Sequence, residues 1–210
     1  MERVVVIGGG GHAKVIVDLL LAAGRYSIAG CVERKPEACS DLGIPLLGDD
    51  LRLPEIYRDG VRYAFVAIGD NRVRRRLSAR AVELGFELAN AVSPTAILSP
   101  RVKLGAGIAI MAGVVINACS QIGDGVIVNT GATIDHDCAI GAWAHIAPGS
   151  NLAGCVRVGE GAFLGVGCRV IPGVSIGEWT TVGAGGVVIH DLPAEVTAIG
   201  VPARVKGESR

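Results

Sequence analysis

The most regular feature of the chain is an aliphatic residue at every sixth position of its second half. The series runs from Leu98 to Val188, and all sixteen of its positions hold Leu, Ile or Val. Neither an α-helix, with a period of about 3.6, nor an ordinary strand, with a period of about 2, gives this spacing. A period of six instead predicts a solenoid of short strands and corners, in which three strands make one coil of eighteen residues.

Two further regularities fit such a coil. The residue after the aliphatic is Gly in seven repeats and Asn or Asp in three, and we expect these residues to adopt the tight or left-handed backbone of the corners. The residue two positions before the aliphatic is often small or β-branched, which suits a narrow interior. Coils stack at about 4.8 Å, so residues eighteen apart are vertical neighbours in about five coils.

The first ninety or so residues have the alternating pattern of an α/β domain. Buried strands are predicted at residues 4–7, 28–32 and 64–68, and helices at 13–23 and 72–85. Strands that alternate with helices favour a small parallel sheet. The expected organisation is therefore a Rossmann-like α/β domain at residues 1–92 and a parallel β-helix domain with a C-terminal extension at residues 93–210.

Three polar or glycine-rich segments follow the predicted strands, at residues 8–12, 33–34 and 69–71. In open parallel sheets, ligands bind beyond the C-terminal ends of the strands, where turns and helix N-termini offer free amides to phosphates. Gly8-x-Gly10-x-x-Ala13 with Glu33 also fits a dinucleotide-binding fingerprint. Nicotinamide chemistry is nevertheless disfavoured, because the segment supplies only part of a dinucleotide-binding fold.

Composition excludes several classes of function. The chain has 20 basic and 20 acidic residues, with no dense basic run interleaved with aromatics, so nucleic acid is not an expected partner. The longest later apolar stretch, residues 16–23, is short and contains Asp18, which argues against membrane insertion. The N-terminus lacks a cleavage site, so we expect a cytoplasmic protein. Six cysteines form no C-x-x-C pair, and we interpret all of them as buried reduced thiols.

Only four histidines are available as a general base, and His136 is the strongest candidate. It lies between Asp135 and Asp137 on a predicted corner, where a carboxylate can orient the imidazole and raise its basicity. The sequence leaves open which aspartate does so. Gly154 follows eighteen residues later, so stacking puts its backbone amide one coil above the base, where it could hold a thioester carbonyl.

A zinc site is the alternative use of these histidines. His136 and His190 share a phase of the repeat but are three coils apart, roughly 14 Å. That separation exceeds the ~2.1 Å ligand distances of a single zinc ion. His145 falls in a different phase again, so no metal is expected.

With these motifs, the whole chain resembles the bacterial sugar acyltransferases of the NeuD/PglD type. The resemblance rests on the glycine–histidine loop at residues 7–15, on residues 67–71, and on Asp135-His136-Asp137 with a histidine nine residues on. It implies a left-handed β-helix and a homotrimer whose active sites lie between adjacent β-helices. It also implies that His136 is the general base, with Asp137 or Asp135 as its acidic partner.

The resemblance further implies two sets of ligand contacts. Acetyl-CoA, the expected co-substrate, would contact His145, Gly154, Val166, Ala184 and Arg204. The nucleotide-linked sugar would lie against Gly10, Gly11, His12, Glu33, Arg34, Gly69, Asp70, Asn71 and Asn129. One departure concerns the nucleotide, because similar enzymes acting on UDP-amino sugars carry paired aspartates where this chain has Glu33-Arg34.

The expected activity is acetyl transfer from acetyl-CoA to the amino group of a UDP-, dTDP- or GDP-linked 4-amino sugar, for a surface glycan or glycoprotein sugar. One alternative is an O-acetyltransferase acting on a sugar hydroxyl such as that of sialic acid. Another is a non-catalytic nucleotide-sugar-binding β-helix protein. An amide product, an ester product and binding without turnover distinguish the three.

Overall fold

The structure is a computed structural model that describes residues 1–35, 41 and 43–207. It separates into two compact units, Met1–Pro94 and Thr95–Arg210. The first unit is built on a parallel four-stranded sheet of order β2-β1-β3-β4. These strands are β1 (Glu2–Ile7), β2 (Tyr26–Val32), β3 (Tyr63–Val66) and β4 (Glu87–Leu88). The predicted parallel α/β sheet is confirmed, with β4 as an added edge strand.

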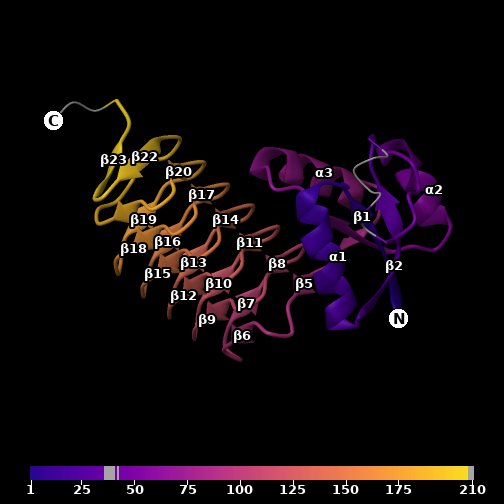
Figure 1. Cartoon of the computed structure of the whole chain (residues 1–210), viewed down its shortest axis with the longest axis horizontal. Coiled ribbons are helices and arrows are strands. Elements are labelled where there is room, and N and C mark those ends of the chain that lie inside the picture. The colour runs from indigo at the N-terminus through magenta and orange to yellow at the C-terminus, as the bar shows by residue number, and fades with distance from the viewer. Residues whose placement is uncertain (36–40, 42, 208–210) are drawn as a thin grey trace. The chain divides into compact units, whose positions relative to one another are not determined.

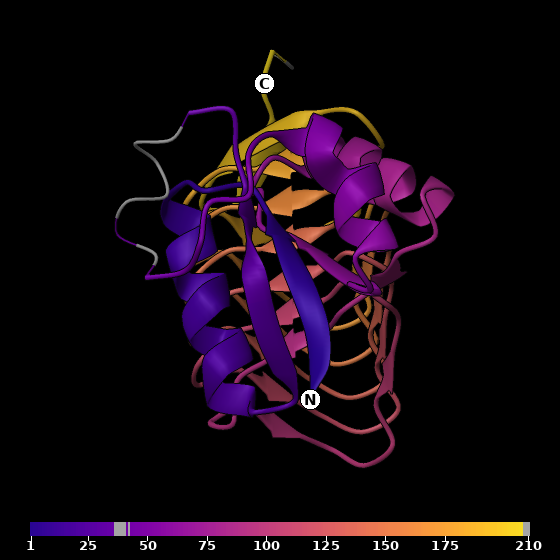
Figure 2. The ribbon, with the colours of Figure 1, turned by 90° about the vertical axis from the view of Figure 1, so that its right-hand side faces the viewer.

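The helices of the first unit lie on both sides of its sheet (Figure 2). They are α1 (Gly11–Ala23), the short 3₁₀ helix η2 (Asp50–Arg52), α2 (Leu53–Arg58) and α3 (Asn71–Glu83). The sequence pattern predicted α1 and α3, with end positions that differ by one or two residues, but not η2 or α2. Among the described residues, no helix combines the length and apolarity that crossing a membrane requires.

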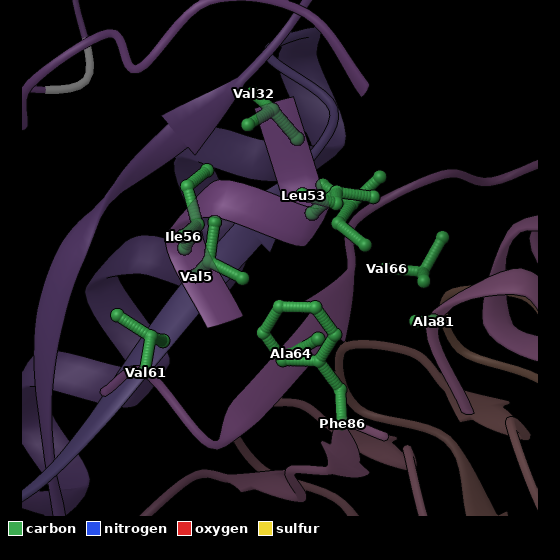
Figure 3. Close-up of a cluster of buried hydrophobic side chains, with 10 residues drawn as sticks. Val5, Val32, Leu53, Ile56, Val61, Ala64, Val66, Ala81 and Phe86 are labelled. Carbon is green, nitrogen blue, oxygen red and sulfur yellow. The ribbon is translucent and has the colours of Figure 1, made fainter. Parts of the chain in front are cut away.

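The sheet of the first unit is covered on both faces, which explains why its central strand is apolar at consecutive positions. Val4, Val5, Val6 and Ile7 of β1 are all buried. Alternate residues of a strand point to opposite faces. One of these faces packs on α2 and α3 in a cluster drawn in Figure 3: Val5, Ile7, Val32, Leu53, Ile56, Val61, Ala64, Val66, Ala81 and Phe86.

The second unit is a parallel β-helix of two-residue strands, seen as a stack in Figure 1. Strand β5 (Ala91–Val92) precedes it. The repeat strands are β6 (Ile97–Leu98), β7 (Lys103–Leu104), β8 (Ala109–Ile110), β9 (Val115–Ile116), β10 (Gln121–Ile122), β11 (Ile127–Val128), β12 (Thr133–Ile134), β13 (Ala139–Ile140), β14 (His145–Ile146), β15 (Asn151–Leu152), β16 (Arg157–Val158), β17 (Phe163–Leu164), β18 (Arg169–Val170), β19 (Ser175–Ile176), β20 (Thr181–Val182) and β21 (Val187–Val188). Strands β22 (Thr197–Gly200) and β23 (Ala203–Val205) follow as an antiparallel pair.

Every repeat strand ends on a member of the aliphatic series, and each strand from β6 to β18 pairs with the strand eighteen residues on. Ile122 pairs with Ile140, for example, and Ile134 with Leu152. At the C-terminal end the spacing shortens, because Thr181 of β20 pairs with Thr197 of β22. The strands therefore form three parallel sheets, one on each side of the coil. This register confirms the predicted β-helix and the rule that residues eighteen apart are vertical neighbours.

The corners differ in detail from the prediction. The left-handed backbone lies at the third residue after each aliphatic, from Gly107 to Gly185, and not at the first. The glycines directly after the aliphatics are needed for a different reason, which is the close approach of the next coil. A Cβ added at Gly141 would lie 2.6 Å from the backbone N of Glu160. These glycines therefore allow stacking rather than an unusual φ.

The residues predicted to face a narrow interior do so, since Val114, Ala132 and Ser150, all small or β-branched, are fully buried. The cysteine prediction is only partly right. Cys31, Cys138 and Cys168 are buried, and burial raises the pKa of Cys168 to about 12. Cys119 and Cys155 are exposed instead, because they occupy left-handed corner positions on the outside of the coil. Cys39 lies outside the described residues.

Candidate active site

His136 lies at an outer corner between β12 and β13, and its neighbour Asp135 fixes that corner. Asp135 Oδ1 accepts a hydrogen bond from the His136 backbone N at 2.8 Å and another from Asn117 Nδ2, also at 2.8 Å. The Asn117 bond, and then the His136 amide, lower the pKa of the Asp135 carboxyl. Asn117 precedes Asp135 by eighteen residues, so this bond joins two stacked coils. The Asp135 carboxylate therefore binds the His136 backbone amide and the Asn117 side chain. Among the described residues, the hydrogen bond to the imidazole ring comes from Asp137 instead.

Asp137 is the carboxylate that contacts the His136 ring. Its Oδ2 lies 2.8 Å from His136 Nδ1, and both side chains are more than half exposed. An ionised carboxylate only accepts hydrogen bonds, so the shared hydrogen is assigned to Nδ1 and the lone pair to Nε2. The bond to Asp137, and then the charge of Asp135, raise the pKa of His136 above its ordinary value of 6.5.

Gly154 lies directly against the other edge of the His136 ring. A Cβ placed on Gly154 would be 2.6 Å from both Cε1 and Nε2 of His136. The backbone N of the next residue, Cys155, donates to the His136 carbonyl O at 2.9 Å, which locks the two coils together. Within the described part of the chain, the Gly154 amide N–H has no hydrogen-bond partner. The corner thus presents an imidazole nitrogen beside an open backbone amide.

His145 and Asn129 form a second polar group on the same β-helix. Asn129 Nδ2 lies 3.2 Å from His145 Nε2, and the His145 ring meets the Phe163 ring edge-on with centroids 5.2 Å apart. Phe163 is paired with His145 one coil on, so this contact follows from the register. Val166, Ala184 and Arg204, the other residues expected at acetyl-CoA, are all exposed on later coils or on β23.

In the first unit, Glu33 holds the glycine loop that leads into α1. Its Oε2 accepts from the Gly9 backbone N at 2.9 Å, and its Oε1 accepts from the backbone N of Arg34 at 2.8 Å and of Lys35 at 3.1 Å. Gly8 in this loop has φ 106°, and a Cβ there would meet Ile68 Cδ1 at 2.7 Å. The Glu33 carboxylate therefore has a positioning role toward the loop.

The segment Gly69–Asn71 is held by a buried arginine that sequence inspection missed. Arg74 Nη1 donates to the carbonyl O of Ile68 at 3.1 Å and of Gly69 at 3.0 Å, and Nη2 donates to Asn71 Oδ1 at 2.9 Å. Burial lowers the pKa of Arg74 to about 10. Asp70 is the N-cap of α3, because its Oδ1 accepts from the Val73 backbone N at 2.8 Å.

A cleft opens at the C-terminal ends of β1, β2 and β3, where the sequence placed the ligand. Its lining includes Glu33 and Arg34, which were predicted, and Asp50 and Arg76, which were not. Arg34 forms an ion pair with Asp50, with Nη2 and Oδ1 3.1 Å apart. The sequence does not predict Asp50, because the short helix η2 has no periodic pattern of hydrophobic residues. Arg76 was only one of several arginines on a predicted helix.

His12, in the first turn of α1, is unlike His136 in its electrostatics. Burial, assisted by the nearby Arg74 guanidinium, lowers its pKa to about 4. Within the described chain, the buried His12 Nε2 has no hydrogen-bond partner. His12 is therefore neutral at pH 7, whereas His136 titrates above pH 6.5.

This difference predicts two separate histidine titrations. In an NMR pH titration, the ring signal of His12 should stay that of a neutral imidazole down to about pH 4. The ring signal of His136 should titrate with its midpoint above pH 6.5. Because the unfolded chain protonates His12 near pH 6.5, acidification from pH 6.5 toward 4 should destabilise the first unit. The His12→Gln and His136→Asn variants assign the signals, and a His12 signal that titrates near pH 6.5 would contradict its burial.

A solenoid of six-residue repeats with a histidine–aspartate pair on an outer corner has the features of a hexapeptide acyltransferase. Residues 3–81 match the PglD N-terminal domain family. The structure of PerB from Caulobacter crescentus in complex with CoA and GDP-perosamine is 57% identical, covers 99% of this chain and 98% of that chain, and has a TM-score of 0.95. The chain belongs to the PglD-type family of bacterial sugar acyltransferases, and its β-helix is left-handed as in that family.

Two further relatives extend the comparison. The acetyltransferase domain of PglB from Neisseria gonorrhoeae, in complex with acetyl coenzyme A, is 38% identical with a TM-score of 0.91, and the match covers 97% of this chain and 98% of that chain. UDP-N-acetylbacillosamine N-acetyltransferase from Bacillus subtilis is 37% identical over 119 residues, which is 53% of this chain. The match covers 52% of that curated relative, about half its length.

Proposed function

We propose that this chain transfers the acetyl group of acetyl-CoA to the amino group of a GDP-linked 4-amino sugar. It is an acyltransferase of the sugar N-acetyltransferase kind, with acetyl-CoA as its co-substrate and no metal in the reaction. The single observation that carries the proposal is the His136 ring, whose Nδ1 is bonded to Asp137 and whose Nε2 faces Gly154. The family of the chain supports the same reaction.

In the proposed mechanism, His136 Nε2 accepts a proton from the sugar amine as the amine attacks the thioester carbonyl. Asp137 stabilises the imidazolium that forms, because its carboxylate is 2.8 Å from Nδ1. The C–N bond forms, the C–S bond breaks, and the proton on His136 passes to the departing CoA thiolate. The products are an amide and free CoA.

The Gly154 amide is the proposed donor to the carbonyl oxygen during this step. Negative charge gathers on that oxygen in the tetrahedral intermediate, and an amide fixed in advance stabilises it. Gly154 is suited to this role because it has no side chain between its amide and the His136 ring. His145 and Asn129 remain proposed contacts of the acyl donor and acceptor.

The nucleotide is proposed to bind in the first unit, at the cleft that Glu33, Arg34 and Asp50 line. Guanine is favoured over uracil because the 57% identical relative is described with GDP-perosamine, whereas the relative named for a UDP-sugar is 37% identical over about half of the chain. Gly10, Gly11 and the N-terminus of α1 would receive phosphate, since Gly10 caps α1 without a side-chain hydrogen bond.

The test is an acetyl-transfer assay with acetyl-CoA and a matched panel of GDP-, UDP- and dTDP-linked 4-amino sugars. Turnover with GDP-perosamine well above the other substrates, and an amide product by mass spectrometry, are expected. Turnover only with the UDP-sugars would overturn the choice of nucleotide. A hydroxylamine-labile ester product would instead establish O-acetylation, and nucleotide-sugar binding without turnover would establish the non-catalytic alternative.

Two further expectations stay proposals. Association as a homotrimer is checked by light scattering of the purified chain, with three times the chain mass of 21.5 kDa as the expected result. A cytoplasmic location stays a proposal, and cell fractionation tests it.

A further inference from the structure

The corner that carries His136 presents a third group that the proposed mechanism does not use. Cys155 is an exposed free thiol. One ligand atom each from His136, Asp137 and Cys155 lie within 4.8 Å of one another. An imidazole nitrogen, a carboxylate oxygen and a thiol sulfur are the three kinds of ligand that Zn²⁺ takes in proteins.

The fold fixes the relative positions of these three residues. Cys155 follows Asp137 by eighteen residues, so the two are stacked, and both have left-handed backbone, with φ 62° and 58°. The backbone N of Cys155 donates to the His136 carbonyl O at 2.9 Å. Tetrahedral zinc with Zn–S of about 2.3 Å and Zn–N of about 2.05 Å places its ligand atoms about 3.5 Å apart. The three side chains are exposed, so they can rotate on the fixed backbone. Such rotation brings the ligand atoms from their present separations, which are within 4.8 Å, to the distance that zinc requires.

We propose that His136, Asp137 and Cys155 form a binding site for Zn²⁺ at which the ion reversibly inhibits the enzyme. The three side chains supply three ligands, and water supplies the fourth on this exposed corner. Zinc binding displaces the thiol proton of Cys155 to solvent, and no bond to carbon is made or broken. The ion is an inhibitor here and not a participant in acetyl transfer.

Zinc bound to either nitrogen of the His136 imidazole would inhibit the reaction. An ion on Nδ1 replaces the hydrogen bond to Asp137. An ion on Nε2 occupies the lone pair that would accept the proton of the amine. The inhibitory effect rests on the proposed function, but the binding of zinc does not.

The chain offers a matched control for this site. Cys119 is also an exposed thiol, one coil before Asp137, and its φ of 64° is that of the same corner position. Among the described residues, Cys119 is not part of the cluster formed by His136, Asp137 and Cys155. Cys119→Ser and Cys155→Ser therefore change the same group in the same backbone setting, on opposite sides of the coil that carries His136.

The experiment is a titration of the purified full chain with ZnCl₂, followed by calorimetry and by acetyl transfer, with the acetylated nucleotide sugar measured by chromatography to avoid thiol reagents. Cys155→Ser is expected to keep the activity measured without zinc and to weaken zinc binding and inhibition by at least about tenfold, with Cys119→Ser close to the parent. Co²⁺ should give a sulfur-to-cobalt absorption band that the Cys155→Ser variant lacks.

Equal zinc affinity in the parent and Cys155→Ser, or no zinc binding by the parent, would overturn the site. Zinc binding that depends on Cys155 supports the site even in protein without transferase activity, because calorimetry needs no turnover. Cys155-dependent binding that leaves an active enzyme uninhibited would overturn the inhibitory role. Failure of the proposed function appears separately, as absence of turnover before any zinc is added.

Discussion

Replacement of His136 by Asn is expected to lower kcat by on the order of 10²-fold or more, with little change in thermal stability. The variant keeps a polar side chain of similar reach but has no nitrogen that can accept a proton from the amine. The side chain is 55% exposed, so its replacement leaves the coil packing intact. The measurement is steady-state acetyl transfer, with differential scanning calorimetry of the same samples.

His190→Asn is the matched control, because His190 is also an exposed histidine of the β-helix unit and has the same phase three coils on. It should retain parent activity. Parent-like turnover of His136→Asn would remove His136 from the role of general base and leave the thioester to be attacked by an amine that loses its proton to water.

The pH profile gives the same hypothesis a second test. A general base works in its neutral form, and the bond to Asp137 and the charge of Asp135 raise the pKa of His136 above 6.5. Activity should therefore rise with pH and reach half its maximum above pH 6.5. Asp137→Asn removes the carboxylate with the larger effect, so the rise should move to lower pH while the maximum rate falls.

The sequence predicted the β-helix well because its period of six fixes both the strand positions and the pairing register. Once eighteen residues make a coil, the vertical neighbours of the regular coils follow from the sequence numbers, and this rule predicts Gly154 against His136. The same arithmetic leads from Asp135 to Asn117 and from Asp137 to Cys155. These two neighbours are therefore also predictable from the sequence.

Other features depend on side-chain directions that no period contains. The sequence pattern leaves Asp135 and Asp137 as equal candidates to contact His136. In the structure the contact to Nδ1 comes from Asp137, the one of the two that has a left-handed φ. The corner glycines were assigned to the wrong physical cause, because a close approach between coils and a left-handed φ both favour Gly. In the first unit, the burial of Arg74 follows from helix packing, which local composition cannot reveal for one arginine among several.

Gly154→Ala is the second change with a large expected effect, a loss of activity on the order of 10²-fold without loss of fold. The added Cβ would lie 2.6 Å from His136 Cε1 and Nε2 and 3.3 Å from Cδ2. These are the three nearest atoms, and all belong to one exposed ring, so the ring must move and the backbone need not. A displacement of about 1 Å of a catalytic group can cost about 10²-fold in rate.

Gly141→Ala is the contrasting variant, because its Cβ would meet backbone atoms of the next coil, Glu160 N at 2.6 Å and Gly159 C at 2.8 Å. It should lower the free energy of unfolding by about 1–3 kcal/mol, as overpacking does, whereas Gly154→Ala should not. A double-mutant cycle then isolates the cause of the activity loss. If Gly154 acts only by leaving room for the His136 ring, Gly154→Ala adds no further loss in the His136→Asn background. A further loss there would instead show that the Ala side chain also disturbs the amide proposed to hold the thioester oxygen.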